Sequence, residues 1–149
     1  MILSRAFKKA LCTILVFASV FSLCVPAAYA SDVSPYTSDY INSYGGYIEK
    51  SKTGALTVFL AIEAAHKMDS IGASSVAIQK KSGNTWTTVK RYSSSTDTHL
   101  MGSNRYTYSD EFSYSSVTSG GTYRAVVSFY VSSGTKSESR LFTSNTLTF

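Results

Sequence analysis

The sequence predicts an all-β protein: a single antiparallel β-sandwich of about seven strands that follows an N-terminal signal peptide. Apolar and polar residues alternate with period two in several segments of the 149-residue chain. No segment shows helical periodicity, and turn sequences rich in Gly and Ser separate the alternating segments. Thr, Val, Tyr and Phe, which suit the pleated surface of a sheet, are frequent in these segments.

Residues 1–30 have the parts of a secretory signal peptide: a basic start, an apolar stretch and a small-x-small site that ends at Ala30. We therefore expect cleavage after Ala30 and a secreted, extracellular protein. An uncleaved membrane anchor and a lipid-modified Cys24 are less favoured alternatives, because the Ala-x-Ala site indicates cleavage and the bulky Leu23 precedes the cysteine.

Removal of this leader changes the bulk properties of the chain. Three of the 14 Lys and Arg residues and none of the 9 Asp and Glu residues precede residue 31, so the net charge falls from +5 to +2. This small net charge does not indicate a basic surface that would bind nucleic acid or an anionic membrane. Cys12 and Cys24 also leave, so the domain must be stable without a disulfide. We expect a flexible segment over residues 31–44 and one β-sandwich domain over residues 45–149.

The strands can be placed in chain order. The first is expected within residues 44–51, and the second, over residues 55–64, directs Leu56, Val58, Leu60 and Ile62 toward the core. The others are expected in residues 74–81, 86–93, 105–116 and 137–149, and within residues 119–134.

Two connections carry specific expectations. "SGNT", residues 82–85, predicts a tight hairpin in which Gly83 and Asn84 supply positive φ angles. "KMDSIGAS", residues 67–74, predicts a loop whose Met68 and Ile71 close the end of the core, with Gly72 permitting a turn. A functional role for this loop is the alternative.

Three residues are expected to be structural: Tyr123, Trp86 and Gly121. In Greek-key sandwiches, a tyrosine near the start of the sixth strand packs into the end of the core and hydrogen-bonds to backbone just upstream. Tyr123 fits this position, and Gly121 before it gives the chain room to turn. Trp86 and Val89 are three residues apart, so both can face the core only if a β-bulge intervenes.

The stretch "GTYRA" resembles a segment of fibronectin type III domains, and "IQKKSGNTWTTVKRYS" resembles the hairpin between their third and fourth strands. The resemblance implies an immunoglobulin-like topology, although those domains usually carry their tryptophan on the second strand. The set "HKMDSIGASSVAIQKKSGNTWTTVKRY", "HLMGSN", "GGTYRAVVSFY" and "SESRLFT" resembles a group of small secreted proteins of Gram-positive bacteria. That resemblance implies a fold and an extracellular address, and it transfers no catalytic residue.

The sequence offers few residues suited to catalysis, and we predict no enzymatic activity, no cofactor and no metal. The histidines are His66 and His99. Asp97 and His99 could share a strand face toward a metal, but two ligands do not fill a coordination sphere. Asp110 and Glu111 are adjacent, so on a strand they point to opposite faces and cannot act as paired acid and base.

The outer face of the last strands is the candidate binding surface, formed by Arg124, Val126, Tyr130, Arg140 and Phe142. This prediction requires Tyr123, Ala125, Val127 and Phe129 to face inward, and Leu141 to face inward as well. Such an apolar and aromatic face is typical of a partner-binding site. The alternative is a second small core, covered by a loop or by the N-terminal segment.

The expected function is therefore a secreted, non-catalytic binding or adhesion module at the cell surface or in the medium. Its partner would be an unknown protein or a cell-wall glycan, and neither nucleic acid nor, after signal cleavage, a membrane. A secreted enzyme inhibitor or hydrolase that acts through its loops is the alternative, which the scarcity of His, Cys and clustered acids disfavours.

Overall fold

The computed structural model describes residues 38–149; the expected signal peptide and residues 31–37 lie outside the described residues. The elements are β1 (Ile41–Lys50), β2 (Leu56–Ser82), β3 (Thr85–Ser93), the 3₁₀ turn η1 (Thr98–Leu100), β4 (Met101–Tyr114), β5 (Thr122–Ser133), β6 (Lys136–Thr143) and β7 (Leu147–Thr148). Every strand pairing among them is antiparallel. The predicted fold class, an all-β antiparallel protein with seven strands, is confirmed.

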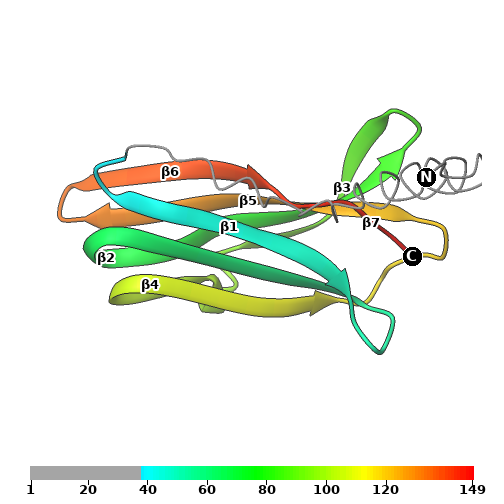
Figure 1. Cartoon of the computed structure of the whole chain (residues 1–149), viewed down its shortest axis with the longest axis horizontal. Coiled ribbons are helices and arrows are strands. Elements are labelled where there is room, and N and C mark those ends of the chain that lie inside the picture. Colours follow the sequence, from blue (N-terminus) through cyan, green and yellow to red (C-terminus); the bar gives the residue numbers. More distant parts are fainter. Residues whose placement is uncertain (1–37) are drawn as a thin grey trace, which may run out of the picture. The chain divides into compact units, whose positions relative to one another are not determined.

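The 27-residue strand β2 belongs to both layers of this fold. Its first part, residues 56–63, pairs with β1 on one side and with β4 on the other. Its last part, residues 75–82, pairs with β3, while β5 pairs along residues 70–80 and joins β6 on its far side. The hydrogen-bonded sheet thus folds over at β2, which places β1 and β4 in one layer and β5 and β6 in the other (Figure 1).

The core lies between these two layers and contains the residues that alternation predicts. Leu56, Val58, Leu60 and Ile62 of β2 are at most 2% exposed. Across the core, the ring of Tyr44 on β1 lies 5.6 Å from the ring of Phe129 on β5. Each fully buried aliphatic or aromatic side chain of this kind contributes about 1.5–3 kcal/mol to folding.

Strand β1 begins at Ile41, before the predicted domain boundary at residue 45. Ile41 is 2% exposed, and its backbone N–H donates to the Ser38 hydroxyl at 2.9 Å. The register between β1 and β2 shifts between Ile41 and Ser43. This bulge interrupts the period-two pattern, which is why alternation did not reveal the start of the strand.

The β2–β3 hairpin forms where it was predicted and extends beyond the neighbouring strands (Figure 1). Gly83 has φ 59°, whereas among the described non-glycine residues only Asn104 has a positive φ. The expectation of a positive φ at Asn84 is therefore wrong. A type II′ turn needs a positive φ only at its first central residue, and Gly83 occupies that place.

Strand β2 continues through the segment that was expected to be a loop. Met68 and Ile71 are 1% and 0% exposed, as predicted for residues that close the core. Gly72, however, makes no turn: it pairs with Met101 on one side and Tyr130 on the other. A Cβ at this position would lie 2.2 Å from the Leu100 carbonyl oxygen, so glycine allows a close backbone approach.

Trp86 does not join the core, which corrects its predicted structural role. A bulge does occur at Val89, because Ile78 pairs with Lys90 and Gln79 with Thr88. Nevertheless Val89 is 41% exposed, and Trp86 contacts the outward side chain of Arg124. Counting pairs from the turn at Gly83 places Trp86 opposite Lys81, on the outer face of the sheet.

Tyr123 occupies the predicted corner at the start of β5. It is 1% exposed, and its hydroxyl accepts a hydrogen bond of 2.9 Å from the Thr118 backbone N–H. Gly120 has φ 72°. A Cβ on Gly121 would lie 2.8 Å from the Tyr123 ring and 2.9 Å from the Thr118 carbonyl oxygen, so this position also requires glycine.

Candidate functional site

Strand β5 has the two faces that alternation predicts. Tyr123, Ala125, Val127 and Phe129 are at most 1% exposed. Their neighbours Arg124, Val126 and Tyr130 are partly exposed on the opposite side of the strand. Three of the five predicted binding residues therefore lie together on the outer face.

The two binding residues predicted on β6 lie on the wrong side of the strand. Arg140 pairs opposite the buried Phe129, and the ring of Phe142 lies 6.3 Å from that of Phe129. Leu141, expected inside, is 71% exposed. The turn after β5 pairs Ser133 with Lys136, and this register directs Arg140 and Phe142 inward.

Arg140, which points inward on β6, forms an ion pair there. The Arg140 guanidinium contacts the Glu138 carboxylate, and the Ser38 hydroxyl donates to the same carboxylate. β6 ends the strand order β1-β2-β5-β6. Inward-pointing charges on an edge strand discourage uncontrolled pairing with other chains. Arg140 thus belongs to the edge of the core and not to the predicted binding surface.

The outer face of β6, β5, the last part of β2 and β3 is called the basic face below. Its charged and larger apolar members, taken from the strand pairing, are Lys81, Trp86, Arg91, Arg124, Val126, Tyr130 and Leu141. The remaining paired positions on this face are small or uncharged polar residues, so within the described residues it carries three cations and no acid.

A fixed arginine lies within the basic face. The Arg124 guanidinium carbon lies 4.3 Å from the centre of the Trp86 ring. Its Nε donates a hydrogen bond of 2.8 Å to the Gln79 side-chain oxygen. Stacking on an indole and a side-chain hydrogen bond both limit the rotamers of an arginine, which leaves its other N–H groups preorganised for a partner.

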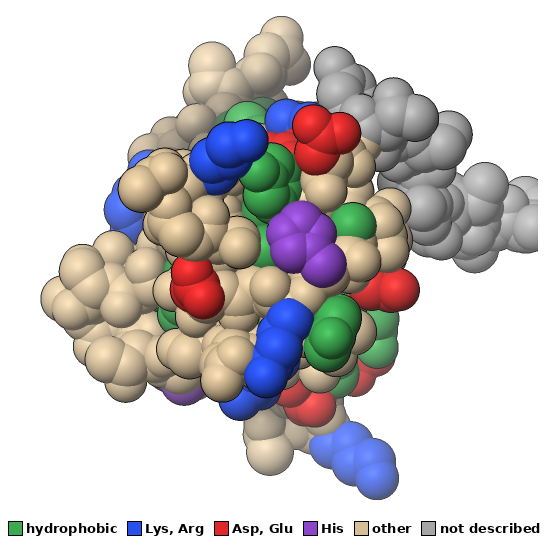
Figure 2. Space-filling model, turned by 90° about the vertical axis from the view of Figure 1, so that its left-hand side faces the viewer, with side chains coloured by type: hydrophobic (Ala, Val, Ile, Leu, Met, Phe, Trp, Pro, Cys, Tyr) green, Lys and Arg blue, Asp and Glu red, His purple; other side chains and the backbone are tan. Residues whose placement is uncertain are grey.

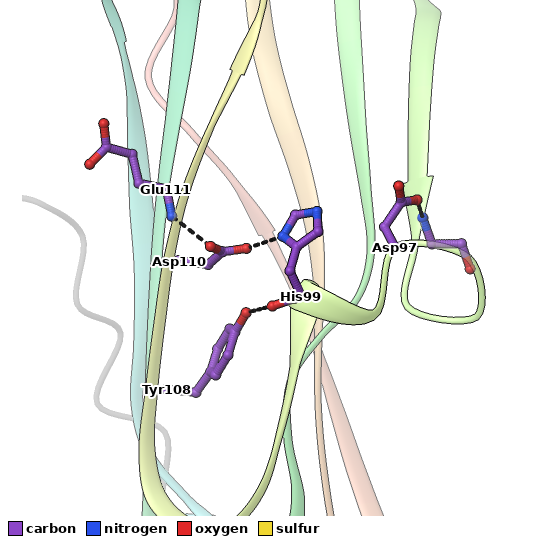
Figure 3. Close-up of polar contacts among 6 residues, drawn as sticks. Asp97, His99, Tyr108, Asp110 and Glu111 are labelled. Atoms are coloured by element: carbon purple, nitrogen blue, oxygen red, sulfur yellow. Dashed lines mark hydrogen bonds and ion pairs between the residues drawn. The ribbon is translucent and has the colours of Figure 1, made fainter.

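A second cluster of polar groups lies on the inner side of β4 and is shown in Figure 3. The His99 Nδ1 atom lies 2.7 Å from Asp110 Oδ2, and the Tyr108 hydroxyl donates to the His99 carbonyl oxygen. The Phe112 ring lies 5.8 Å from the imidazole. Asp110, which is the one charged residue in a row of aromatic residues, is thus partnered by His99. No sequence pattern indicated this contact, because His99 comes from the 3₁₀ turn η1 and not from the same strand.

Asp97 does not share a site with His99. Its carboxylate accepts a hydrogen bond of 3.0 Å from the Ser93 backbone N–H (Figure 3). It also accepts one of 2.9 Å from the Thr96 hydroxyl. The first of these bonds is the main reason that the pKa of Asp97 lies below its usual value. Among residues 38–149, no group of three or more His, Cys, Asp or Glu side chains could hold a metal ion.

Tyr108 should make the domain sensitive to alkaline pH. Burial, followed by the nearby Asp110 charge, raises the pKa of Tyr108 from 10.0 to about 12. A group whose pKa is higher in the folded than in the unfolded protein stabilises the fold below its unfolded pKa, and this contribution is lost as pH rises through the folded pKa. We expect stability to fall between pH 10 and about 12.

Urea unfolding at pH 8 to 12 measures this effect, and Tyr108→Phe should fall less steeply than the unchanged protein because it has no proton to lose. Tyr106→Phe is the matched control, since Tyr106 is 56% exposed on the same strand. An equally steep fall in Tyr108→Phe would contradict the assignment.

Other parts of the surface are mixed in character. Figure 2 views the end of the molecule that carries the β5–β6 turn, where basic, acidic and histidine side chains are interspersed among polar ones. The ring of His66, the other histidine, lies 5.4 Å from that of Tyr40. The part of the chain that the structure describes contains no helix of the length and apolarity needed to cross a membrane.

The fold and the two sites define the class as an all-β antiparallel sandwich with a basic outer sheet face. Comparison of the chain with family models, with curated proteins and with solved structures found no match. The resemblance to small secreted proteins of Gram-positive bacteria therefore stays a prediction.

Proposed function

We propose that the protein is a secreted, non-catalytic module of immunoglobulin-like topology that binds a protein or a cell-wall glycan through its basic face. The leader sequence supports secretion. Two observations support the topology. One part of β2 pairs with β1 and β4, and the other part lies in the layer of β3, β5 and β6. The hydrogen-bonded corner at Tyr123 is the second.

The observation that carries the binding proposal is the Trp86–Arg124 stack on an open sheet face. Aromatic residues and arginine are enriched at binding surfaces because they combine a large contact area with few rotatable bonds. Val126, Tyr130 and the 71% exposed Leu141 extend this surface across β5 and β6. An arginine held flat offers paired N–H groups that match a carboxylate or a phosphate.

Capture experiments test this proposal. Mature protein is incubated with cell walls and culture medium of the source organism, and bound material is quantified. Trp86→Ala combined with Arg124→Glu should lower capture at least tenfold, because the variant removes the aromatic surface and reverses its charge. Both side chains are partly exposed, so the change in melting temperature should be small.

The matched control places the same two kinds of change elsewhere. Tyr106→Ala combined with Lys136→Glu alters an exposed tyrosine and an exposed lysine outside the basic face, and capture should be retained. Undiminished capture by the Trp86 and Arg124 variant, with its fold intact, would contradict the proposal.

A hydrolase that uses His99 is the second candidate. Its Nδ1 faces the Asp110 carboxylate, which is the orientation that prepares the other ring nitrogen to act as a general base. Among the described residues, no serine or threonine hydroxyl hydrogen-bonds to His99. Hydrolysis of an ester, peptide or glycoside by the protein, lost in His99→Ala, would favour this candidate and overturn the non-catalytic proposal.

A further inference from the structure

The outer face of the opposite layer, called the acidic face below, has the reverse charge. It consists of the outward positions of β1, β4 and the first part of β2. Its charged and aromatic members are Tyr47, Glu49, Phe59, Glu63 and Glu111. The other outward positions that pair along residues 57–63 of β2 are Gly, Ala, Ser and Thr, so this paired part of the face carries three acids and no Lys or Arg.

An aromatic pair lies between these acids. The rings of Tyr47 and Phe59 are stacked, with centres 4.6 Å apart and planes 17° apart. Tyr47 is 49% exposed. Glu111 is the strand partner of Phe59 on its other side, so a carboxylate directly adjoins the stacked rings.

The two outer faces therefore complement each other. The basic face combines Lys81, Arg91 and Arg124 with an indole, and the acidic face combines three glutamates with stacked rings. In residues 38–149 the salt bridges join His99 to Asp110 and Arg140 to Glu138, so neither uses a charge from these faces. The net charge of +2 after leader removal conceals this separation.

We propose that the basic face of one copy binds the acidic face of a second copy. This inference rests on the proposed function, because it names the partner of the same surface. An anionic polymer would satisfy the basic face alone, whereas a second copy satisfies both faces, in charge and in aromatic surface. That double match favours a second copy.

The contact is heterologous, since it joins two different surfaces. Each bound copy still presents one free face of each kind at the ends of the assembly, so addition can continue into a row instead of stopping at a dimer. Neighbouring strands lie about 4.8 Å apart, so a face of three or four strands is narrow. The area that it can bury is therefore smaller than that of a standard protein–protein interface. We therefore expect weak association that depends on protein concentration and salt.

Analytical ultracentrifugation of the mature protein at low salt tests this inference. The weight-average mass should rise with concentration up to the millimolar range, and 0.5 M NaCl should reverse the rise. Two charge-reversed variants are compared: Arg91→Glu with Arg124→Glu, and Glu63→Lys with Glu111→Lys. Each alone should associate at least tenfold more weakly, because like charges then meet.

The decisive sample is the equimolar mixture of the two variants. One variant presents two acidic faces and the other two basic faces, so the mixture should regain association. The control is Lys52→Glu with Lys136→Glu, which makes the same charge change as the two arginine substitutions but at exposed sites outside both faces. This control should associate like the unchanged protein. Thermal unfolding checks that every variant is folded.

The outcomes separate this inference from the proposed function. A protein that stays monomeric at millimolar concentration, or a mixture that stays monomeric, overturns self-association. If capture from cell walls still depends on Trp86 and Arg124 in that case, the proposed function stands. Binding to a soluble anionic polymer, such as polyphosphate, without self-association also overturns the inference and assigns the basic face to anionic ligands.

Discussion

Gly72→Ala is expected to destabilise the domain by about 3 kcal/mol or more, because the added methyl group cannot be accommodated without moving a backbone. Its Cβ would lie 2.2 Å from the Leu100 carbonyl oxygen and 3.0 Å from the Met101 Cα. Both atoms belong to the main chain, which cannot rotate away as a flexible side chain can. Gly72 also has φ 155°, which is unfavourable for an alanine. Urea unfolding monitored by tryptophan fluorescence and by circular dichroism measures the loss.

Gly45→Ala on β1 is the control for this substitution. No heavy atom lies within 4 Å of a Cβ built at Gly45, and its φ is not positive. The alanine there should change stability by no more than about 0.5 kcal/mol. Equal stabilities of the two variants would show that β2 and β4 do not approach each other closely at Gly72.

The close approach at Gly72 also shows which parts of this fold sequence patterns can predict. Period two reveals a strand when one face is buried along its length, as in β5, where buried and partly exposed residues alternate from Thr122 to Val131. The same rule misplaces the segment around Gly72, because β2 there passes from one layer to the other and pairs on both edges. Buried residues follow each other directly in this segment, so period two is lost. A segment without alternation is then predicted as a loop.

The inverted phase of β6 has a different cause. Leu141 is the single aliphatic residue of that strand, and hydrophobicity alone assigns it to the core. The hairpin register decides otherwise, because pairing Ser133 with Lys136 brings Arg140 opposite Phe129. Counting back from the turn at Gly134 would have given this result, and the same counting from Gly83 would have placed Trp86 on the outer face. Turn chemistry therefore deserves more weight than composition on short edge strands.

The candidate sites could be predicted only where they depend on one strand. Arg124, Val126 and Tyr130 follow from alternation along β5. The contact between His99 and Asp110 joins a 3₁₀ turn to a strand, and no spacing rule relates residues that meet in this way. The separation of charge between the two outer faces likewise needs the register of all the strands, because acids and bases are interspersed along most of the sequence.

The corner at Tyr123 is the second feature with a large expected effect. Its hydroxyl accepts from the Thr118 backbone N–H at 2.9 Å and lies 3.1 Å from the Thr118 hydroxyl. The Thr118 hydroxyl also accepts from the Lys80 ammonium at 2.7 Å, and the Thr118 carbonyl accepts from the Gly121 N–H at 3.0 Å. One phenol oxygen thus holds the connection between β4 and β5 against the end of the core.

Tyr123→Phe is expected to cost about 1–3 kcal/mol of unfolding free energy, because the ring stays buried while the Thr118 N–H loses its acceptor. Tyr130→Phe, seven residues along the same strand, is the matched control, because it deletes the same atom from a partly exposed position on the outer face. Its unfolding free energy should change by about 0.5 kcal/mol or less. Urea unfolding gives both values, and hydrogen exchange at the Thr118 and Gly121 amides should accelerate only in Tyr123→Phe. Equal losses in the two variants would mean that burial of the ring, and not the bond to Thr118, is what Tyr123 contributes at this corner.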